Sequence, residues 1–311
     1  MSKYVISCSP HLRDNVTTRS IMQDVCIAML PACIAGVLFF GYRAAIILVL
    51  SVAAAVLSEK FYCKASHIKD TTGDFSAVVT GLLLALNLST NVPVWQCIVG
   101  TLFAIVCVKC LFGGIGCNFA NPAITARIML LSAFTEVRAV AHTSFEAADI
   151  VSGATPLGVM GGEKGTLPEL LDMLLGVRGG AIGETCAIAL ILGGIYLIAR
   201  RVISWHTPVI YVATVFVLSL IIKQDVTMAL YQVLGGGLMI GAIFMATDYS
   251  TTPLNKLGKA VFALGCGLLT VLIRFLGGSP EGVSYAILMM NILSPYIEKL
   301  CACKPFGKVG K

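Results

Sequence analysis

One short polar stretch of the sequence combines residues that could carry a covalently attached group. It spans residues 149–157 and reads DIVSGATPL. Gly153 and Ala154 keep the backbone free of bulky side chains, and Pro156 biases Thr155 toward an extended conformation. The hydroxyl of Thr155 should therefore project from a tight turn, where it could be esterified. The same residues also suit an ordinary surface turn.

A second candidate for chemistry is Asp248, in the segment MATDYSTTP. A carboxylate beside a membrane span could bind a sodium ion or relay a proton, because acids near spans often mark ion paths. Equally, Asp248 could cap the following turn with Ser250 and Thr251. Both interpretations stay open at this point.

Three further polar residues lie in the segment CNFANPAITARIML: Asn118, Asn121 and Arg127. They could line a cofactor pocket or an ion path, or satisfy the open backbone of a broken helix. Cys107 and Cys110 form a CxxC, but within a helix they share a face without a closed set of four ligands, so we expect no metal site. The run Gly235–Gly237 predicts close helix packing.

The elements that must position these residues are membrane helices. Hydrophobic residues make up 57% of the 311-residue chain, charged residues only 12%, and the mean hydropathy is +0.90. A soluble chain has about 25% charged residues, so this one could not cover its surface in water. The net charge of +6 follows from basic residues near the membrane, and no nucleic-acid partner is expected.

A helix needs about 20 apolar residues to cross the hydrocarbon core. Ten segments are candidate spans, of which the third and fifth are short enough to be tilted, broken or re-entrant. The ten are residues 21–40, 44–61, 75–88, 94–112, 119–134, 182–199, 208–222, 228–247, 259–273 and 283–297.

The distribution of Lys and Arg predicts the orientation. With the N-terminus in the cytoplasm, 15 of the 22 basic residues fall inside, six outside, and Arg127 within a span. This bias is the one expected for cytoplasmic loops. It puts both termini in the cytoplasm and the 135–181 loop, with Thr155, outside.

Similar features recur in the two halves of the chain. GLLLALNLSTNVPVW and LFGGIGCNFANPAITARIML precede the loop, and GLMIGAIFMATDYSTTPL and FLGGSPEGVSYAILMMNIL follow it. Five spans per half is an odd number, so the halves should insert with opposite orientation. The predicted fold is all-α, with a tail (1–20), a five-helix repeat (21–134), the outer loop (135–181), an inverted five-helix repeat (182–299) and a basic tail (300–311).

The motif and the span pattern together resemble a known family. Asp149, Ser152, Gly153, Ala154 and Thr155 match the Asp-x-x-Ser/Thr-Gly-Ala-Thr pattern at which a flavin transferase moves FMN from FAD onto the last threonine. The whole chain resembles the D subunits of the Rnf complex, the ion-translocating ferredoxin:NAD oxidoreductase of bacteria. It is similar, more distantly, to the B subunits of the sodium-translocating NADH:quinone reductase.

The resemblance implies a multi-pass subunit of the bacterial cytoplasmic membrane that is not catalytic alone. It implies FMN bound covalently through phosphate to Thr155, and a second, unattached flavin such as riboflavin. Arg127 could then pair with the flavin phosphate or with an acid of the outer loop. Implied partners are membrane lipid, the other Rnf subunits with their iron–sulfur and flavin carriers, and the transferase during maturation. Electron flow would drive Na⁺ or H⁺ outward.

Two other functions remain open from the residues. An inverted repeat could form the pore of a secondary transporter or channel for a small polar solute, as in urea-channel-like proteins. The chain could also be a passive scaffold that holds partner subunits.

Overall fold

The computed structural model describes residues 16–135, 137, 155–161, 167–176, 178–277 and 281–302. Within these ranges the regular secondary structure is helical, which confirms the predicted all-α class. The helices before the 135–181 loop are α1 (Thr18–Phe40), α2 (Tyr42–Ala65), the 3-10 turn η1 (Thr72–Asp74), α3 (Ser76–Leu86), α4 (Val94–Leu102) with its π-helical continuation η2 (Phe103–Cys110), and α5 (Pro122–Ala133).

The loop contributes two short helices, α6 (Pro156–Met160) and α7 (Leu170–Leu175). The second group of helices follows. It consists of α8 (Ala187–Ala199), α9 (His206–Lys223), α10 (Val226–Leu234), α11 (Leu238–Ile240) with the π-helix η4 (Gly241–Met245), α12 (Lys256–Leu276) and α13 (Val283–Leu300).

The helices differ in length and in how much apolar surface they expose. Among the described residues, four helices are long and apolar enough to cross a membrane: α1, α2, α9 and α12. The pair α10 and Leu238–Met245, bent by 64°, would make a fifth span. The long helices expose large apolar side chains such as Leu38, Val49 and Ile221, each at least 65% exposed. An apolar exposed surface of this kind suits contact with lipid, and the protein is therefore a multi-pass membrane protein.

Several of the helices are short, and one of them, α3, lies inside the molecule. Each of the ten predicted segments contains helix, but α3, α5 and α8 have only 11 to 13 residues. Nine of the 11 residues of α3 are buried. Irregular or short helices at membrane depth are tolerated only where protein covers them, and α3 meets this condition.

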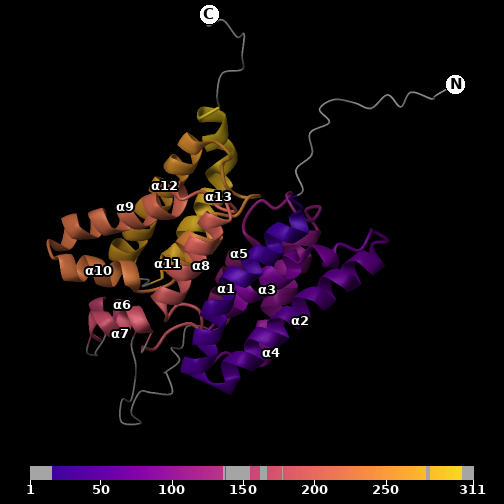
Figure 1. The fold of residues 1–311 in the computed structure, drawn as a ribbon, viewed down its shortest axis with the longest axis horizontal. Coiled ribbons are helices and arrows are strands. Elements are labelled where there is room, and N and C mark those ends of the chain that lie inside the picture. The colour runs from indigo at the N-terminus through magenta and orange to yellow at the C-terminus, as the bar shows by residue number, and fades with distance from the viewer. Residues whose placement is uncertain are drawn as a thin grey trace, which may run out of the picture.

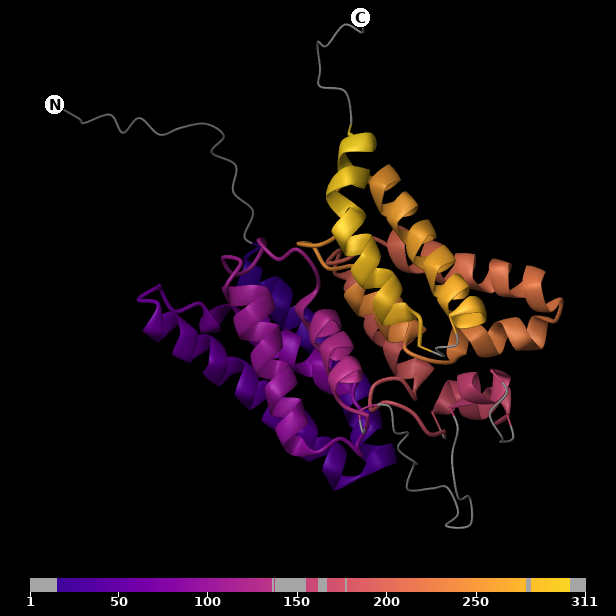
Figure 2. The same ribbon diagram turned by 180° about the vertical axis from the view of Figure 1, so that it is seen from behind.

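The helices form two groups that lie side by side (Figures 1 and 2). One group holds α1 to α5 and the other α8 to α13. The groups meet where α1 packs against α8 and α5 packs against α13. Gly193 of α8 allows this approach, since a Cβ there would lie 2.2 Å from the carbonyl oxygen of Ala28.

Side-chain caps fix where several helices begin. Asn121 caps α5, accepting from the N–H groups of Ala123 and Ile124, and the proline that follows it suits the first helical position. Asp225 caps α10 in the same way through the N–H of Thr227. The start of α1 and the end of α13 lie at one end of the molecule, whereas α6 and α7 lie toward the other end (Figures 1 and 2).

Candidate functional site

Thr155, the predicted attachment residue, lies within the described residues and immediately precedes α6. Its backbone is extended, with φ −59° and ψ 153°, as the following proline favours. The Oγ1 atom accepts a hydrogen bond from the N–H of Gly158 at 3.0 Å and so caps α6. The side chain is half-buried. The rest of the predicted motif lies outside the described residues: Asp149, Ser152, Gly153 and Ala154.

The short helix α6 docks on the break between α10 and α11. Leu157, two residues after Thr155, is buried against Gly235 and Gly236. A Cβ at Gly236 would lie 2.6 Å from Leu157 Cδ1 and 2.9 Å from Arg274 Nη2, so only glycine fits there. The interpretation of this glycine run as helix packing is therefore incomplete. The run ends α10, and Gly236 has φ +65°.

Two arginines satisfy the carbonyl groups that the break leaves open. Arg178 Nη2 donates to the carbonyl of Leu234 at 2.7 Å. Arg274 donates to the carbonyl oxygens of Gln232 and Gly235. The last carbonyls of a helix have no partner within the helix, and cations are favourable at that end. These side chains therefore stabilise the break inside the protein.

Arg127, the predicted cofactor-binding arginine, lies beside the same break and is buried. Its Nη1 donates to Asn87 Oδ1 and its Nη2 forms an ion pair with Glu281 Oε2, both at 2.5 Å. Nη1 also lies 3.1 Å from the position a Cβ would take at Gly237. Arg127 thus has the acidic partner that its depth requires. That partner comes from the loop before α13 and not from the 135–181 loop.

We call five charged residues around Gly235–Gly237 the break cluster. Glu184 interacts electrostatically with Glu281, Arg127 and Arg178, and Arg274 interacts with both glutamates. Among the described residues, the buried Nε atoms of Arg178 and Arg274 have no hydrogen-bond partner. The break cluster comprises Arg127, Arg178, Glu184, Arg274 and Glu281.

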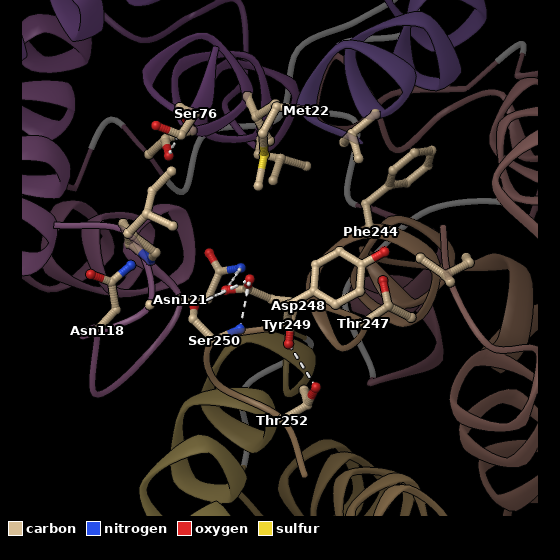
Figure 3. A pocket seen from close by; sticks show the side chains of 18 of the residues that line it. Met22, Ser76, Asn118, Asn121, Phe244, Thr247, Asp248, Tyr249, Ser250 and Thr252 are labelled. Carbon is tan, nitrogen blue, oxygen red and sulfur yellow. Dashed lines mark hydrogen bonds between the residues drawn. The ribbon is translucent and has the colours of Figure 1, made fainter. Parts of the chain in front are cut away.

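The other three predicted site residues line one cavity of about 360 Å³, together with Met22 near the start of α1 and Glu298 near the end of α13. Asp248, Asn118 and Asn121 all line it, together with residues of α1, α3 and η4 (Figure 3). Asn121 Nδ2 donates to Asp248 Oδ2 at 3.4 Å. Asn118 Oδ1 is buried without a partner in the described part of the chain. We call this space the central cavity.

Within the described part of the chain, the hydrogen bonds to the carboxylate of Asp248 are long, whereas its backbone carbonyl accepts a short one from Thr252 Oγ1 at 2.6 Å. The carboxylate oxygens accept from Ser250 and Thr251 at 3.2–3.4 Å, longer than the usual hydroxyl–oxygen distance of about 2.7–2.8 Å. The expected turn cap is therefore present but loose. Loss of hydration raises the pKa of the Asp248 carboxyl, against the lowering effect of these hydrogen bonds. Either a proton or a cation would stabilise the group here.

A buried ion pair beside the central cavity was not predicted from the sequence. Lys109 Nζ donates to both carboxylate oxygens of Glu59, at 2.9 and 2.8 Å, and to Ser76 Oγ. The two charged side chains are only 2% and 1% exposed. The charge pattern placed Lys109 among the cytoplasmic basic residues. The sequence signal that could have predicted the pair is the position of both residues. Lys109 lies within the apolar run 103–110, and Glu59 lies at the end of another apolar run.

The fold and its polar regions define a class: a helical multi-pass membrane protein with polar sites between two helix groups. The family model described as "NQR2, RnfD, RnfE family" matches residues 5–307. The chain therefore belongs to this family, which confirms the resemblance found in the sequence.

The relatives found are the D subunits of larger complexes. The chain is 43% identical over 306 residues to that of the Na(+)-translocating ferredoxin:NAD(+) oxidoreductase complex of Acetobacterium woodii, covering 97% of this chain and 95% of the relative. It is 38% identical over 320 residues to that of the proton-translocating ferredoxin:NAD(+) oxidoreductase complex of Clostridium ljungdahlii, covering 98% and 96%. It is 35% identical over 325 residues to that of the ion-translocating oxidoreductase complex of Stutzerimonas stutzeri, covering 93% and 92%.

Proposed function

We propose that the protein is the flavin-carrying membrane subunit of an ion-translocating ferredoxin:NAD oxidoreductase complex. Family membership over nearly the whole chain and the names of the relatives support the complex. The main structural support for an attached flavin is the position of Thr155. Its half-buried hydroxyl caps a short helix, α6, that is seated on the helix break beside the break cluster.

The attachment chemistry requires only a reachable hydroxyl and a flavin donor. The flavin transferase would join Thr155 Oγ1 to the FMN phosphorus of FAD, break the pyrophosphate bond, and release AMP and a proton. The residues present fit the group, because the buried Nε atom of Arg274, which lies beside Gly236 together with Leu157 of α6, has no partner among the described residues. FMN supplies electron transfer in single or paired steps, whereas the protein holds it in place.

The topology of the two helix groups is part of this proposal. We infer ten spans in two inverted halves, with the termini in the cytoplasm and Thr155 outside. Two observations support it. The first helices of the two groups, α1 and α8, pack against each other, and so do the last ones, α5 and α13. Contacts between corresponding helices are expected where a two-fold axis relates two inverted repeats. In addition, α6 and α7 lie away from the start of α1 and the end of α13 (Figure 1).

The central cavity is the best candidate for an ion path. Asp248, Asn118, Ser250 and Thr252, whose side chains carry oxygen atoms, are among its lining residues, and hard cations take oxygen ligands. The coupling ion is left open, because one relative is named for sodium and another for protons. In the intact complex, Asp248→Asn should abolish ion transport. The matched variant is Asn118→Asp, which keeps the Asp248 carboxylate in the cavity and should keep transport. Unchanged transport in Asp248→Asn would exclude this path.

A second, unattached flavin such as riboflavin is a further proposal from the resemblance. The central cavity is within the size range of ligand sites, about 300–1,000 Å³, and apolar residues such as Met22 and Phe244 line part of it. Flavin released from Thr155→Val protein on denaturation would support this proposal. The absence of any released flavin would contradict it.

One experiment tests the proposed function. A denaturing gel of protein from cells that contain the transferase should show flavin fluorescence at the 32.8 kDa mass of the chain. Thr155→Val should remove the band, whereas Thr227→Val, at an exposed threonine of α10, should keep it. A dark wild-type band would favour the alternative function, a transporter or channel for a small polar solute. The central cavity between the two helix groups is the observation that favours this alternative.

A further inference from the structure

The charges of the break cluster do not balance. Among the described residues it contains three arginines and two glutamates, which leaves one positive charge in excess when all five are ionised. Arg127 and Glu281 form a direct pair. Arg178 and Arg274 donate mainly to backbone carbonyls. Charge inside a protein is costly when it is not compensated, so one further anion beside the break cluster would balance its charge.

Arg274 and Leu157, which lies in the segment after Thr155, both lie beside Gly236. A Cβ at Gly236 would lie 2.9 Å from Arg274 Nη2, 2.6 Å from Leu157 Cδ1 and 3.4 Å from Glu184 Oε1. Atoms of Arg274, Leu157 and Glu184 therefore surround Gly236, and Leu157 follows Thr155 by two residues in the sequence. Within the described chain, Arg274 also has an unpartnered buried Nε. Its cation and this free donor are suited to a phosphate oxygen.

We propose that Arg274 is the positioning residue for the phosphodiester that joins the flavin to Thr155, and that this contact supplies the missing anion and locks α6 against the helix break. The proposal rests on the proposed function, because it needs the flavin on Thr155. A phosphodiester carries one negative charge, which equals the excess in the break cluster. Attachment of the flavin would therefore stabilise the packing of α6 and the break together.

The structural role of Arg274 as a cap must be separated from this contact. The cap exists with or without the flavin, so its loss should cost the same in both states. A double-mutant cycle between residues 155 and 274 isolates the difference. The four proteins are the wild type, Thr155→Val, Arg274→Gln and the double variant, each purified in the complex from a host that contains the transferase.

The measurement is the melting temperature of the subunit in each protein, with in-gel fluorescence as the check on attachment. We expect Arg274→Gln to lower the melting temperature more in the flavin-bearing protein than in the Thr155→Val background. Equal losses in the two backgrounds would overturn the proposal while leaving the proposed function intact. If the wild-type band showed no flavin fluorescence, the proposed function itself would be contradicted.

A second variant covers the case in which Arg274→Gln does not fold. Arg274→Lys keeps the charge but loses the planar set of donors. Its loss should also be larger with the flavin attached. The matched control is Arg200→Gln, an exposed arginine at the end of α8, whose effect should be the same in both backgrounds. A background-dependent effect of Arg200→Gln, or none for Arg274→Lys, would contradict the proposal.

Discussion

The two polar regions between the helix groups are built differently. In the break cluster, charged side chains are tied to backbone carbonyls or to each other, as Arg127 is to Glu281. In the central cavity, described residues hold the carboxylate of Asp248 by hydrogen bonds of 3.2–3.4 Å beside an open space of about 360 Å³. The arrangement in the break cluster suits residues that hold a segment in a fixed position. The arrangement in the central cavity suits a carboxylate that exchanges a proton or an ion.

The largest stability effect should come from the buried pair at the edge of the central cavity. Lys109→Met leaves the carboxylate of Glu59 buried without its cation, and removing one partner of such a pair costs about 3–5 kcal/mol. Urea or thermal unfolding of the detergent-solubilised subunit would measure the loss. The double variant Lys109→Met/Glu59→Gln should recover part of it. If Lys109→Met were as stable as the wild type, the pair would not be a fixed element of the cavity wall.

A smaller effect is expected from the glycine at the helix break. Gly236→Ala places a Cβ within 3 Å of Leu157 and Arg274 at a backbone φ of +65°, and overpacking of this kind costs about 1–3 kcal/mol. The melting temperature should fall, and proteolysis within the α6 segment should become faster. Gly73→Ala is the matched control, because a Cβ there meets nothing within 4 Å. Equal effects at the two glycines would contradict the docking of α6.

Asn121 connects a structural cap to the central cavity. Asn121→Ala removes the cap of α5 and should cost about 0.5–2 kcal/mol. Asn121→Asp keeps a capping oxygen but removes the amide that donates to Asp248 and adds a second carboxylate. Its stability should be close to the wild type at low pH and lower at neutral pH, where two carboxylates repel each other. A pH-independent stability difference between Asn121→Asp and the wild type would contradict this geometry.

The smallest effect should come from the exposed pair at the end of α8. Arg200 lies 3.2 Å from Asp24 and is 58% exposed. Surface pairs of this kind contribute about 0–1 kcal/mol. Arg200→Gln should therefore change the unfolding free energy by less than Lys109→Met or Gly236→Ala. If Arg200→Gln lowered the unfolding free energy as much as Lys109→Met, solvent exposure would not determine how much these ion pairs contribute to stability.

Local sequence patterns predicted the helices well, because apolar runs and caps act over a few residues. The start of α5, set by Asn121, follows from such a signal. The run Gly235–Gly237 was recognised, but its role depends on Leu157, which lies far earlier in the chain. Arg127 was expected to need an anion, yet only the fold shows that Glu281 supplies it.

The candidate site was predicted only in part, because its residues are distant from one another in the sequence. Thr155 was found from a contiguous motif, and the structure shows it as a cap on α6. Asp248, Asn118 and Asn121 were singled out separately, and the fold brings all three to one cavity. The burial of Lys109 was not predicted, because its partner Glu59 lies 50 residues away on another helix.

The most direct test of the account is the mass of the peptide that contains Thr155. Trypsin should release residues 139–164 from protein matured in a host with the flavin transferase. We predict that this peptide carries the added mass of FMN less one water, and that fragment ions place the addition on Thr155 and not on Thr143. A peptide with the unmodified mass throughout would contradict the central claim.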